Sequence, residues 1–170
     1  MVKIRIGLMV FLCFTSCIDQ KLHIRNVQNP GALDIDGVYL SETNKEDPRE
    51  IACSVIFLYR NSVMVTGGVY KSDLKNNFDG TMEKFASLAR EKTDFGVYDI
   101  SKGEIYMEFW EPSSGGPLKT TINKARIIDK RNFIITYMKS NYKGAERLVD
   151  ELYKFYPVKH KPDSTNNFIR

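Results

Sequence analysis

The chain contains three cysteines, and the surroundings of each one predict a different use of its thiol. Cys13 lies in an apolar run near the N-terminus, and Cys17 follows the small residues Thr15 and Ser16. Cys53 alternates in phase with Val55, which predicts a small buried hydrophobe rather than a nucleophile or a metal ligand. If a leader carries Cys13 away and Cys17 is modified, Cys53 has no partner for an internal disulfide.

The first sixteen residues have the composition of an export signal. Lys3 and Arg5 precede the apolar run 6–14, which is about half the ~20 residues that a membrane-spanning helix needs. The ending Phe14-Thr15-Ser16-Cys17 resembles the lipobox of bacterial lipoproteins. This resemblance implies that a diacylglyceryl group is added to the Cys17 sulfur and that the leader is cut before it. The alternative is an ordinary secretory signal with a chance cysteine.

The residue after the cysteine is Ile18 rather than the Asp that can hold such proteins at the inner membrane, so the resemblance favours the outer membrane without specifying a face. Two or three acyl chains give lasting attachment, because each buried methylene contributes ~0.8 kcal/mol. The predicted organisation is a signal peptide (1–16), a lipidated cysteine with a flexible tether (17–33), a barrel domain (34–158) and a tail (159–170). The ~16 tether residues would reach roughly 50 Å when extended.

The ionisable residues give no recognised catalytic pattern. The chain lacks a Gly-x-Ser-x-Gly elbow, a phosphate loop and a His-Glu-x-x-His motif. His23 and His160 fall in the predicted tether and tail. Four carboxylates that could form an acid/base pair are Asp99, Glu104, Glu108 and Glu111. Glu104 and Glu108 share one face of a predicted strand, but nothing in the sequence marks them as buried, so we interpret them as solvated surface charges. We expect no enzyme activity, metal or cofactor.

The residues after 34 alternate between strand and turn patterns. Strands are predicted at 35–41, 51–60, 63–66, 95–100, 104–110, 118–128, 132–138 and 147–156. The last of these also fits a helix, but a strand there would close the sheet by pairing with the first. Gly67-Gly68 predicts a bulge or a sharp bend. Met82, Phe85 and Ala89 lie on one face of a predicted helix capped by Asp79 or Thr81.

Eight antiparallel strands with one short helical insert predict a closed barrel, since closure removes unpaired edges. The interior of such a barrel holds either packed side chains or one small ligand. Nine alternating residues are predicted to line this interior: Val55, Phe57, Tyr59, Ile105, Met107, Phe109, Phe133, Ile135 and Tyr137. The alternative is that these side chains simply fill it.

Short motifs add a family resemblance. Gly37-Val38-Tyr39 resembles the Gly-x-Trp strand that opens lipocalins, with Tyr in place of Trp. The stretch 95–105 and the ending 161–169 resemble small uncharacterised lipoproteins of the Bacteroidetes that carry a lipocalin-like (calycin-like) domain. The resemblance implies a barrel at the cell envelope, and it implies no reaction.

The charge balance argues against a nucleic-acid partner. Of 25 basic residues, Lys3 and Arg5 lie in the leader, which leaves 23 against 21 acidic residues. The predicted partners are the membrane, through Cys17, and a small apolar or amphipathic ligand. The alternative function is a non-enzymatic structural or interaction lipoprotein with a solid barrel, to which the basic residues of 119–131 could contribute. Asp163-Ser164-Thr165 resembles a short O-glycosylation motif and adds a side hypothesis.

Overall fold

The computed structural model describes residues 19–24, 30–42, 52–111, 116–142 and 144–169. The predicted signal peptide and Cys17 lie outside these residues. No helix within the described ranges is long and apolar enough to span a membrane.

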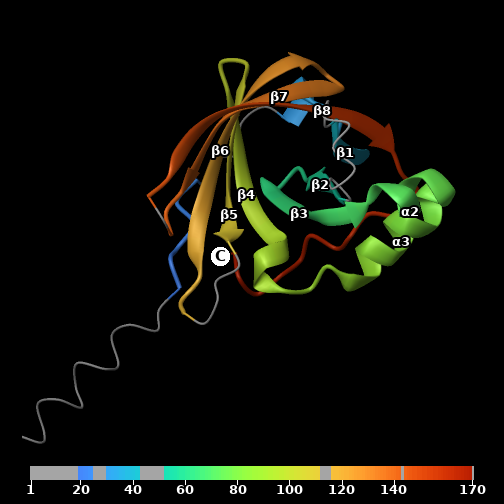
Figure 1. The fold of residues 1–170 in the computed structure, drawn as a ribbon, viewed down its shortest axis with the longest axis horizontal. Coiled ribbons are helices and arrows are strands. Elements are labelled where there is room, and N and C mark those ends of the chain that lie inside the picture. Colours follow the sequence, from blue (N-terminus) through green and yellow to red (C-terminus); the bar gives the residue numbers. More distant parts are fainter. Residues whose placement is uncertain (1–18, 25–29, 43–51, 112–115, 143, 170) are drawn as a thin grey trace, which may run out of the picture.

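Eight antiparallel strands close into a barrel, which confirms the predicted fold class (Figure 1). Each strand pairs with the next one, and the last pairs with the first, so that Tyr39 lies opposite Phe155. The fold is compatible with a calycin-like barrel. The strands are β1 (Gly37–Glu42), β2 (Ala52–Leu58), β3 (Val63–Tyr70), β4 (Phe95–Ser101), β5 (Glu104–Glu111), β6 (Lys119–Asp129), β7 (Asn132–Ser140) and β8 (Glu146–Pro157).

Two helices follow β3: α2 (Lys71–Asn76) and α3 (Phe78–Leu88). The helix predicted around Met82 is therefore present as α3, while α2 was not predicted. The predicted caps are wrong, because Asn77 is the N-cap and its side chain accepts from the Gly80 N–H. Gly67 does not form a bulge either. It pairs in register with Val55, and a Cβ there would lie 2.7 Å from the Phe85 ring, so the glycine lets α3 pack closely on β3.

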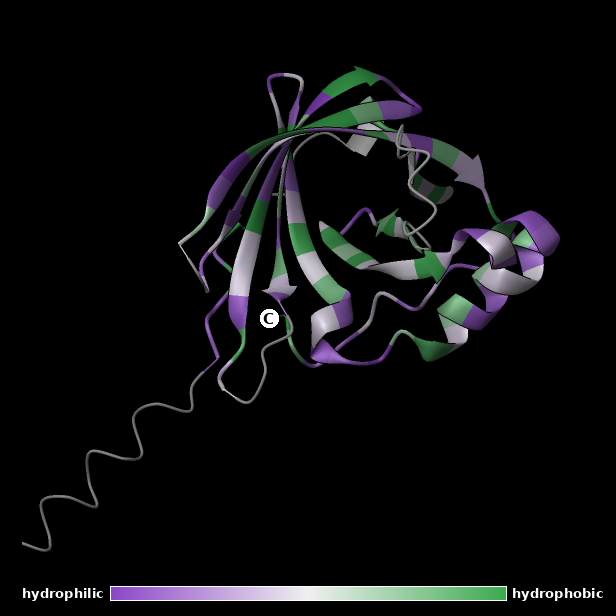
Figure 2. Ribbon diagram, in the orientation of Figure 1, coloured by the Kyte–Doolittle hydropathy of each residue, from purple (hydrophilic) through white to green (hydrophobic). Residues whose placement is uncertain are grey.

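The barrel wall is buried on both of its faces along most of β2 and along parts of β1, β3, β4 and β5. The inner core contains side chains from all eight strands, including Tyr39, Met64 and Phe133. The outer layer covers the opposite face of the first strands and includes Val55 and Met82. Figure 2 shows the corresponding hydrophobic positions along the strands and on the helices. Two hydrophobic cores thus share one sheet.

A short 3-10 helix, η1 (Pro30–Ala32), leads into β1 at one end of the barrel. The Tyr39 hydroxyl donates to the carbonyls of Asp34 and Lys130, and Leu33 joins the inner core. The Lys161 ammonium donates to the carbonyls of Ile35 and Leu58 at 2.6 and 2.9 Å. These contacts close this end, which we call the closed end.

The described segment 19–24 and the C-terminal tail both pack on the outer layer. Leu22 is buried there, whereas a flexible tether was predicted for this stretch. In the tail, Phe168 contacts the Phe95 ring and Ile169 packs against the layer.

Candidate functional site

The deep interior of the barrel is filled with side chains. Tyr39, Phe133 and Met107 have no exposed surface, whereas side chains that line a water-sized void would keep some. The Phe133 ring lies 5.0 Å from the rings of both Tyr39 and Tyr153, and it stacks on Tyr153. A ligand therefore has no room at this depth.

The structure brings together five of the nine residues that were predicted to line the interior. These five belong to the inner core or pack against it: Ile105, Met107, Phe109, Phe133 and Ile135. Only Phe109 keeps partial exposure, and the other four are fully buried. They fill the barrel instead of lining a cavity, as the alternative interpretation held.

Val55, Phe57 and Tyr59 lie on the outside of the barrel wall, so their predicted position is corrected. All three belong to the outer layer, where Phe57 stacks on Phe85 of α3 with ring centroids 5.7 Å apart. The physical reason is that both faces of β2 are buried, so that hydrophobicity along this strand does not reveal which face points inward.

Tyr137 also lies on the outside, because β7 contains a bulge around Thr136. The pairings with β6 and with β8 both shift register at this point. Ile135 points inward before the bulge and Met138 packs on the inner core after it. Tyr137 therefore pairs with the outward-facing Lys124, opposite to its predicted direction.

A polar rim lies near the other end of the barrel and consists of Glu111, Thr121, Asn123 and Ser140. Thr121 and Asn123 face inward, since they pair with Phe109 and Met107. The hydroxyls of Thr121 and Ser140 donate to Glu111 Oε2 at 3.0 and 2.6 Å. Asn123 Oδ1 is buried and has no hydrogen-bond partner in the described part of the chain. Within the described ranges, no three His, Cys, Asp or Glu side chains gather closely enough to hold a metal ion.

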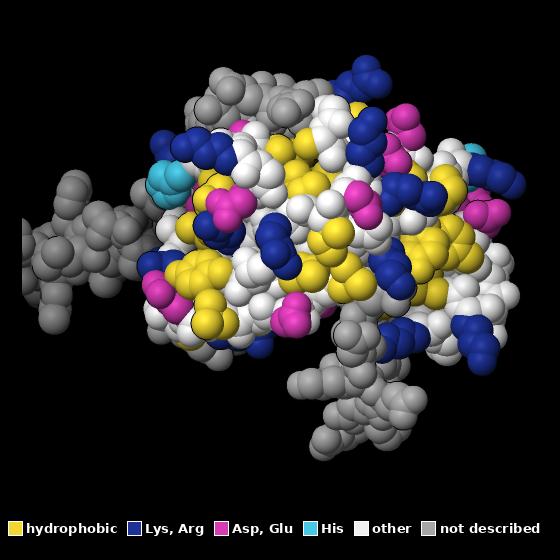
Figure 3. Space-filling model, turned by 90° about the horizontal axis from the view of Figure 1, so that it is seen from above, with side chains coloured by type: hydrophobic (Ala, Val, Ile, Leu, Met, Phe, Trp, Pro, Cys, Tyr) yellow, Lys and Arg dark blue, Asp and Glu magenta, His cyan; other side chains and the backbone are white. Residues whose placement is uncertain are grey.

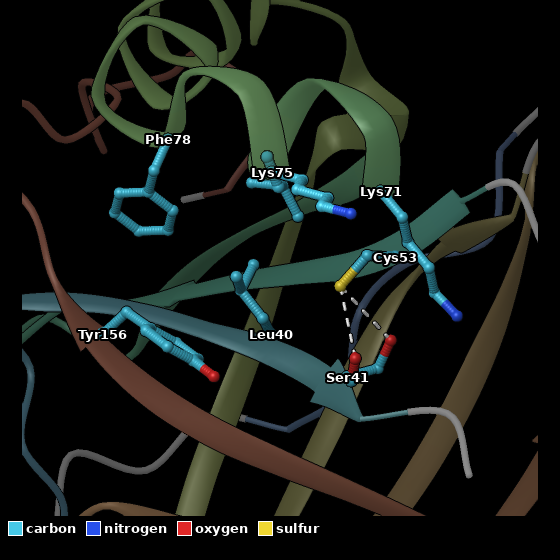
Figure 4. Close-up of a pocket in the computed structure, with 8 residues that line it drawn as sticks. Leu40, Ser41, Cys53, Lys71, Lys75, Phe78 and Tyr156 are labelled. Carbon is cyan, nitrogen blue, oxygen red and sulfur yellow. Dashed lines mark hydrogen bonds between the residues drawn. The ribbon is translucent and has the colours of Figure 1, made fainter.

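A groove with a volume of about 390 Å³ lies between α2–α3 and the barrel wall (Figure 4). Its lining residues come from β1, β2, α2, α3 and β8: Leu40, Ser41, Cys53, Lys71, Leu74, Lys75, Phe78 and Tyr156. The volume falls near the lower limit of small-molecule pockets, which span about 300–1,000 Å³. Sequence reasoning missed this site because α2 carries no clear apolar periodicity.

The groove has an apolar end and a cationic end. Phe78 and Tyr156 lie at one end, with ring centroids 5.9 Å apart, and Leu40 lies between the two ends. Figure 4 shows Lys71 beside Cys53 at the other end, and Lys75 above the middle. The groove can thus hold an apolar chain and place positive charge beside its polar head.

Cys53 contributes little chemistry to this groove. It is buried, as predicted, and its thiol donates to the Ser41 carbonyl at 3.2 Å. Although Lys71 lies beside it, a buried thiol that is held in this way lacks the accessible surroundings of reactive cysteines.

Glu108 is buried on the outer face of β5, although it was predicted to be a solvated charge. Its Oε2 accepts from the backbone N–H groups of His23 and Ile24 at 2.5 and 3.0 Å, and Oε1 lies 3.4 Å from His23 Nδ1. Glu104, which was paired with it in the acid/base hypothesis, instead forms an exposed ion pair with Lys124. The two carboxylates therefore do not form a common site. The burial of Glu108 depends on the distant N-terminal segment, which strand alternation does not indicate.

Charge is mixed over the surface near the closed end. Figure 3 shows lysine and arginine side chains interspersed with acidic and hydrophobic ones on the face seen from above. No single basic patch dominates this face, which gives no support there to a polyanionic partner.

Comparisons of the chain with protein-family models, with curated proteins and with solved structures give no match.

Proposed function

We propose that this protein is a lipid-anchored envelope protein that binds a small amphipathic anion in the groove between α2–α3 and the barrel wall. The observation that carries the proposal is the division of this groove into an apolar end, at Phe78 and Tyr156, and a cationic part, with Lys71 at the other end and Lys75 above the middle. An unbranched fatty acid, with its apolar tail and its carboxylate, has the matching division. The binding is non-enzymatic.

The apolar wall supplies most of the expected affinity. Burial of each methylene contributes ~0.8 kcal/mol, which corresponds to roughly a fourfold decrease in Kd. The ammonium groups of Lys71 and Lys75 orient the carboxylate and add less, because ion pairs near solvent contribute about 0–1 kcal/mol. Chain length and head-group charge should therefore affect binding separately.

The test is calorimetric titration of the purified protein with octanoate, decanoate and dodecanoate below their micellar concentrations. We expect Kd to fall by roughly fourfold for each added methylene until the groove is full. Leu74→Trp, which fills the groove from α2, should weaken binding of the longest chain most. A Kd that does not change with chain length, or the absence of saturable binding, would refute the proposal.

A matched pair of variants separates the groove charges from general electrostatics. Lys71→Ala/Lys75→Ala removes two charges from the groove, and Lys84→Ala/Lys130→Ala removes two exposed charges elsewhere. Only the first pair should weaken binding, and it should weaken binding of all three chain lengths by the same factor. Equal losses in both variants would indicate attraction to net charge alone.

The anchor rests on the leader and on the lipobox resemblance of Phe14-Thr15-Ser16-Cys17. Its test is Cys17→Ser in the native cell, with labelled fatty acid. We expect the variant to lose the label and to leave the membrane fraction. Labelling that persists in the variant would refute acylation at this cysteine.

The second candidate is an interaction or structural lipoprotein with a solid barrel. The observation that favours it is the complete burial of Tyr39, Met107 and Phe133 in the inner core. It predicts that none of the three fatty acids binds, which the same titration measures.

A further inference from the structure

The segment 19–24 is attached firmly to the outside of the barrel at the start of β6. The Leu118 N–H donates to Asp19 Oδ1 at 2.8 Å, and the Gln20 N–H donates to the Leu118 carbonyl at 2.9 Å. Lys92 Nζ lies 2.7 Å from Asp19 Oδ2. The Trp110 indole N–H donates to the Gln20 carbonyl at 2.7 Å. The segment is therefore held from its first described residue.

The rest of the segment is held by burial. Leu22 is 8% exposed, and the carboxylate of Glu108 accepts from the next two backbone N–H groups. Without these donors Glu108 would be a buried charge with no compensation, which is costly. Attachment of this segment and burial of Glu108 thus depend on one another.

The distance from a lipid on Cys17 to this attached segment is short, because only Ile18 separates Cys17 from Asp19. Two residue steps span at most ~7 Å, compared with the roughly 50 Å expected of a free tether. We propose that the anchor holds the barrel directly on the bilayer, with the end where β5 ends and β6 begins facing the lipid. This inference rests on the proposed acylation of Cys17.

If the anchor is this short, the barrel has a near face, which lies toward the membrane, and a far face, which points away from it. The near face contains Leu118 and the turn 90–94, whose Lys92 binds Asp19. From there β6 runs for ten residue steps, about 33 Å along the strand, to the turn at Lys130. Figure 1 shows the segment 19–24 and that turn at opposite ends of the barrel. Lys130, at the closed end, is therefore expected to point away from the membrane.

The experiment places one fluorophore on each face of the full-length, acylated protein in vesicles that contain lipids with a quencher in the acyl chain. Arg90→Cys labels the near face and Lys130→Cys labels the far face, each in a Cys53→Ala background. Both positions are exposed. We expect several-fold stronger quenching at position 90 than at position 130.

A linker variant supplies the control. Insertion of a twelve-residue Gly/Ser segment after Ile18 would allow roughly 20 Å of root-mean-square separation between anchor and barrel. It leaves the lipobox and the attached segment unchanged, so acylation should persist while the difference in quenching between the two positions is lost.

The outcomes separate this inference from the proposed function. Fatty-acid labelling with equal quenching at both positions would overturn the fixed orientation and leave the anchor intact. Absence of labelling at Cys17 would refute the anchor, and the orientation would fall with it. A difference in quenching that survives the linker would also overturn the inference, since a short connection would then not be its cause.

Discussion

The two faces of the barrel wall are buried by different parts of the chain. The inner core is built by the strands themselves, with fully buried rings such as Tyr39 and Phe133. The outer layer is covered by segments outside the sheet: residues 19–24, α2, α3 and the tail. Barrel closure fixes the inner core, whereas the outer cover is composed of separate pieces that meet at grooves.

This difference indicates where binding can evolve in such a small barrel. An interior that is filled by aromatic stacking admits a ligand only at the cost of its own packing. A groove under α2 and α3 can change with the helices while the sheet stays intact. The proposed ligand groove accordingly lies on the outer side of the wall, as does the segment 19–24 from which the proposed membrane orientation is argued.

The largest expected effect is on the inner core. Phe133→Ala should lower the free energy of unfolding by about 3–5 kcal/mol, because it removes a ring from the middle of the aromatic stack. Phe85 of α3 is only half-buried, so Phe85→Ala should lower the free energy of unfolding clearly less. Denaturant unfolding followed by circular dichroism measures both. If the two variants lose equal stability, the distinction between the inner core and its cover is wrong.

The next largest effect is expected on the attachment of residues 19–24, which Glu108 of β5 holds on the outside of the barrel wall. Glu108→Ala removes the acceptor of two part-buried hydrogen bonds, from the N–H groups of His23 and Ile24, at a cost of about 1–3 kcal/mol in total. Hydrogen exchange should accelerate in residues 19–24 while the strands of the inner core stay protected. Glu104→Ala, which breaks the ion pair with Lys124 and a hydrogen bond from the Tyr106 hydroxyl, is the control and should leave exchange in residues 19–24 unchanged.

Much of the fold could be predicted from the sequence, because strand alternation and turn residues act locally. The turn Lys102-Gly103 has positive φ at both positions, as a two-residue hairpin requires, and it joins two strands that were predicted within a residue or so. By contrast, α2 was missed. Its six residues contain one partly buried hydrophobe, Leu74, so no periodic pattern could reveal it.

The candidate site was harder to predict for a physical reason. Alternation identifies the two faces of a strand but not which face points inward, and in β2 both faces are apolar. A bulge at Thr136 turns the side chain of Tyr137 outward, and no glycine in β7 indicates the bulge in the sequence. Glu108 looked solvated because its partners lie 84 and 85 residues earlier in the chain. Each error concerns a contact that is distant in sequence.

The buried tyrosines provide a smaller, pH-dependent test. Burial raises the pKa of Tyr98 to about 12 and raises the pKa values of Tyr39, Tyr59 and Tyr153 as well. Their contribution to the free energy of unfolding has its full value below pH 10 and is lost as the pH rises through their pKa values in the folded chain. The lowered pKa of Lys161 acts in the opposite direction but involves a single group.

We therefore expect the free energy of unfolding to fall steadily above about pH 10. Tyr98→Phe removes one of the titrating groups together with its hydrogen bond to the Tyr59 carbonyl, so the decline should become shallower. Thermal unfolding at pH 8 to 11 measures this slope. An unchanged slope would mean that Tyr98 ionises equally well in the folded chain.

The smallest expected effect concerns Asp19, at the point where the cover begins. Its pKa is lowered by the hydrogen bond from the Lys92 side chain and by that from the Leu118 N–H. A lowered carboxyl pKa contributes stability above about pH 4, and this contribution is lost as the pH falls through the folded-state value. The fluorescence of Trp110, the only tryptophan in the sequence, should respond because Lys92 lies 4.5 Å from its ring centroid.

Asp19→Asn isolates this contribution, because it keeps the size of the side chain while removing its charge. In the variant, Lys92 loses its anionic partner at every pH, so the acid-induced change at Trp110 should be smaller than in the wild type. The inner core should contribute little, since the Asp19 carboxylate accepts from Lys92 and from the Leu118 N–H, neither of which belongs to it. An acid transition of the same size in both proteins would show that protonation of another group detaches the segment 19–24. Glu108, which accepts from two backbone N–H groups of this segment, would then be the next residue to substitute.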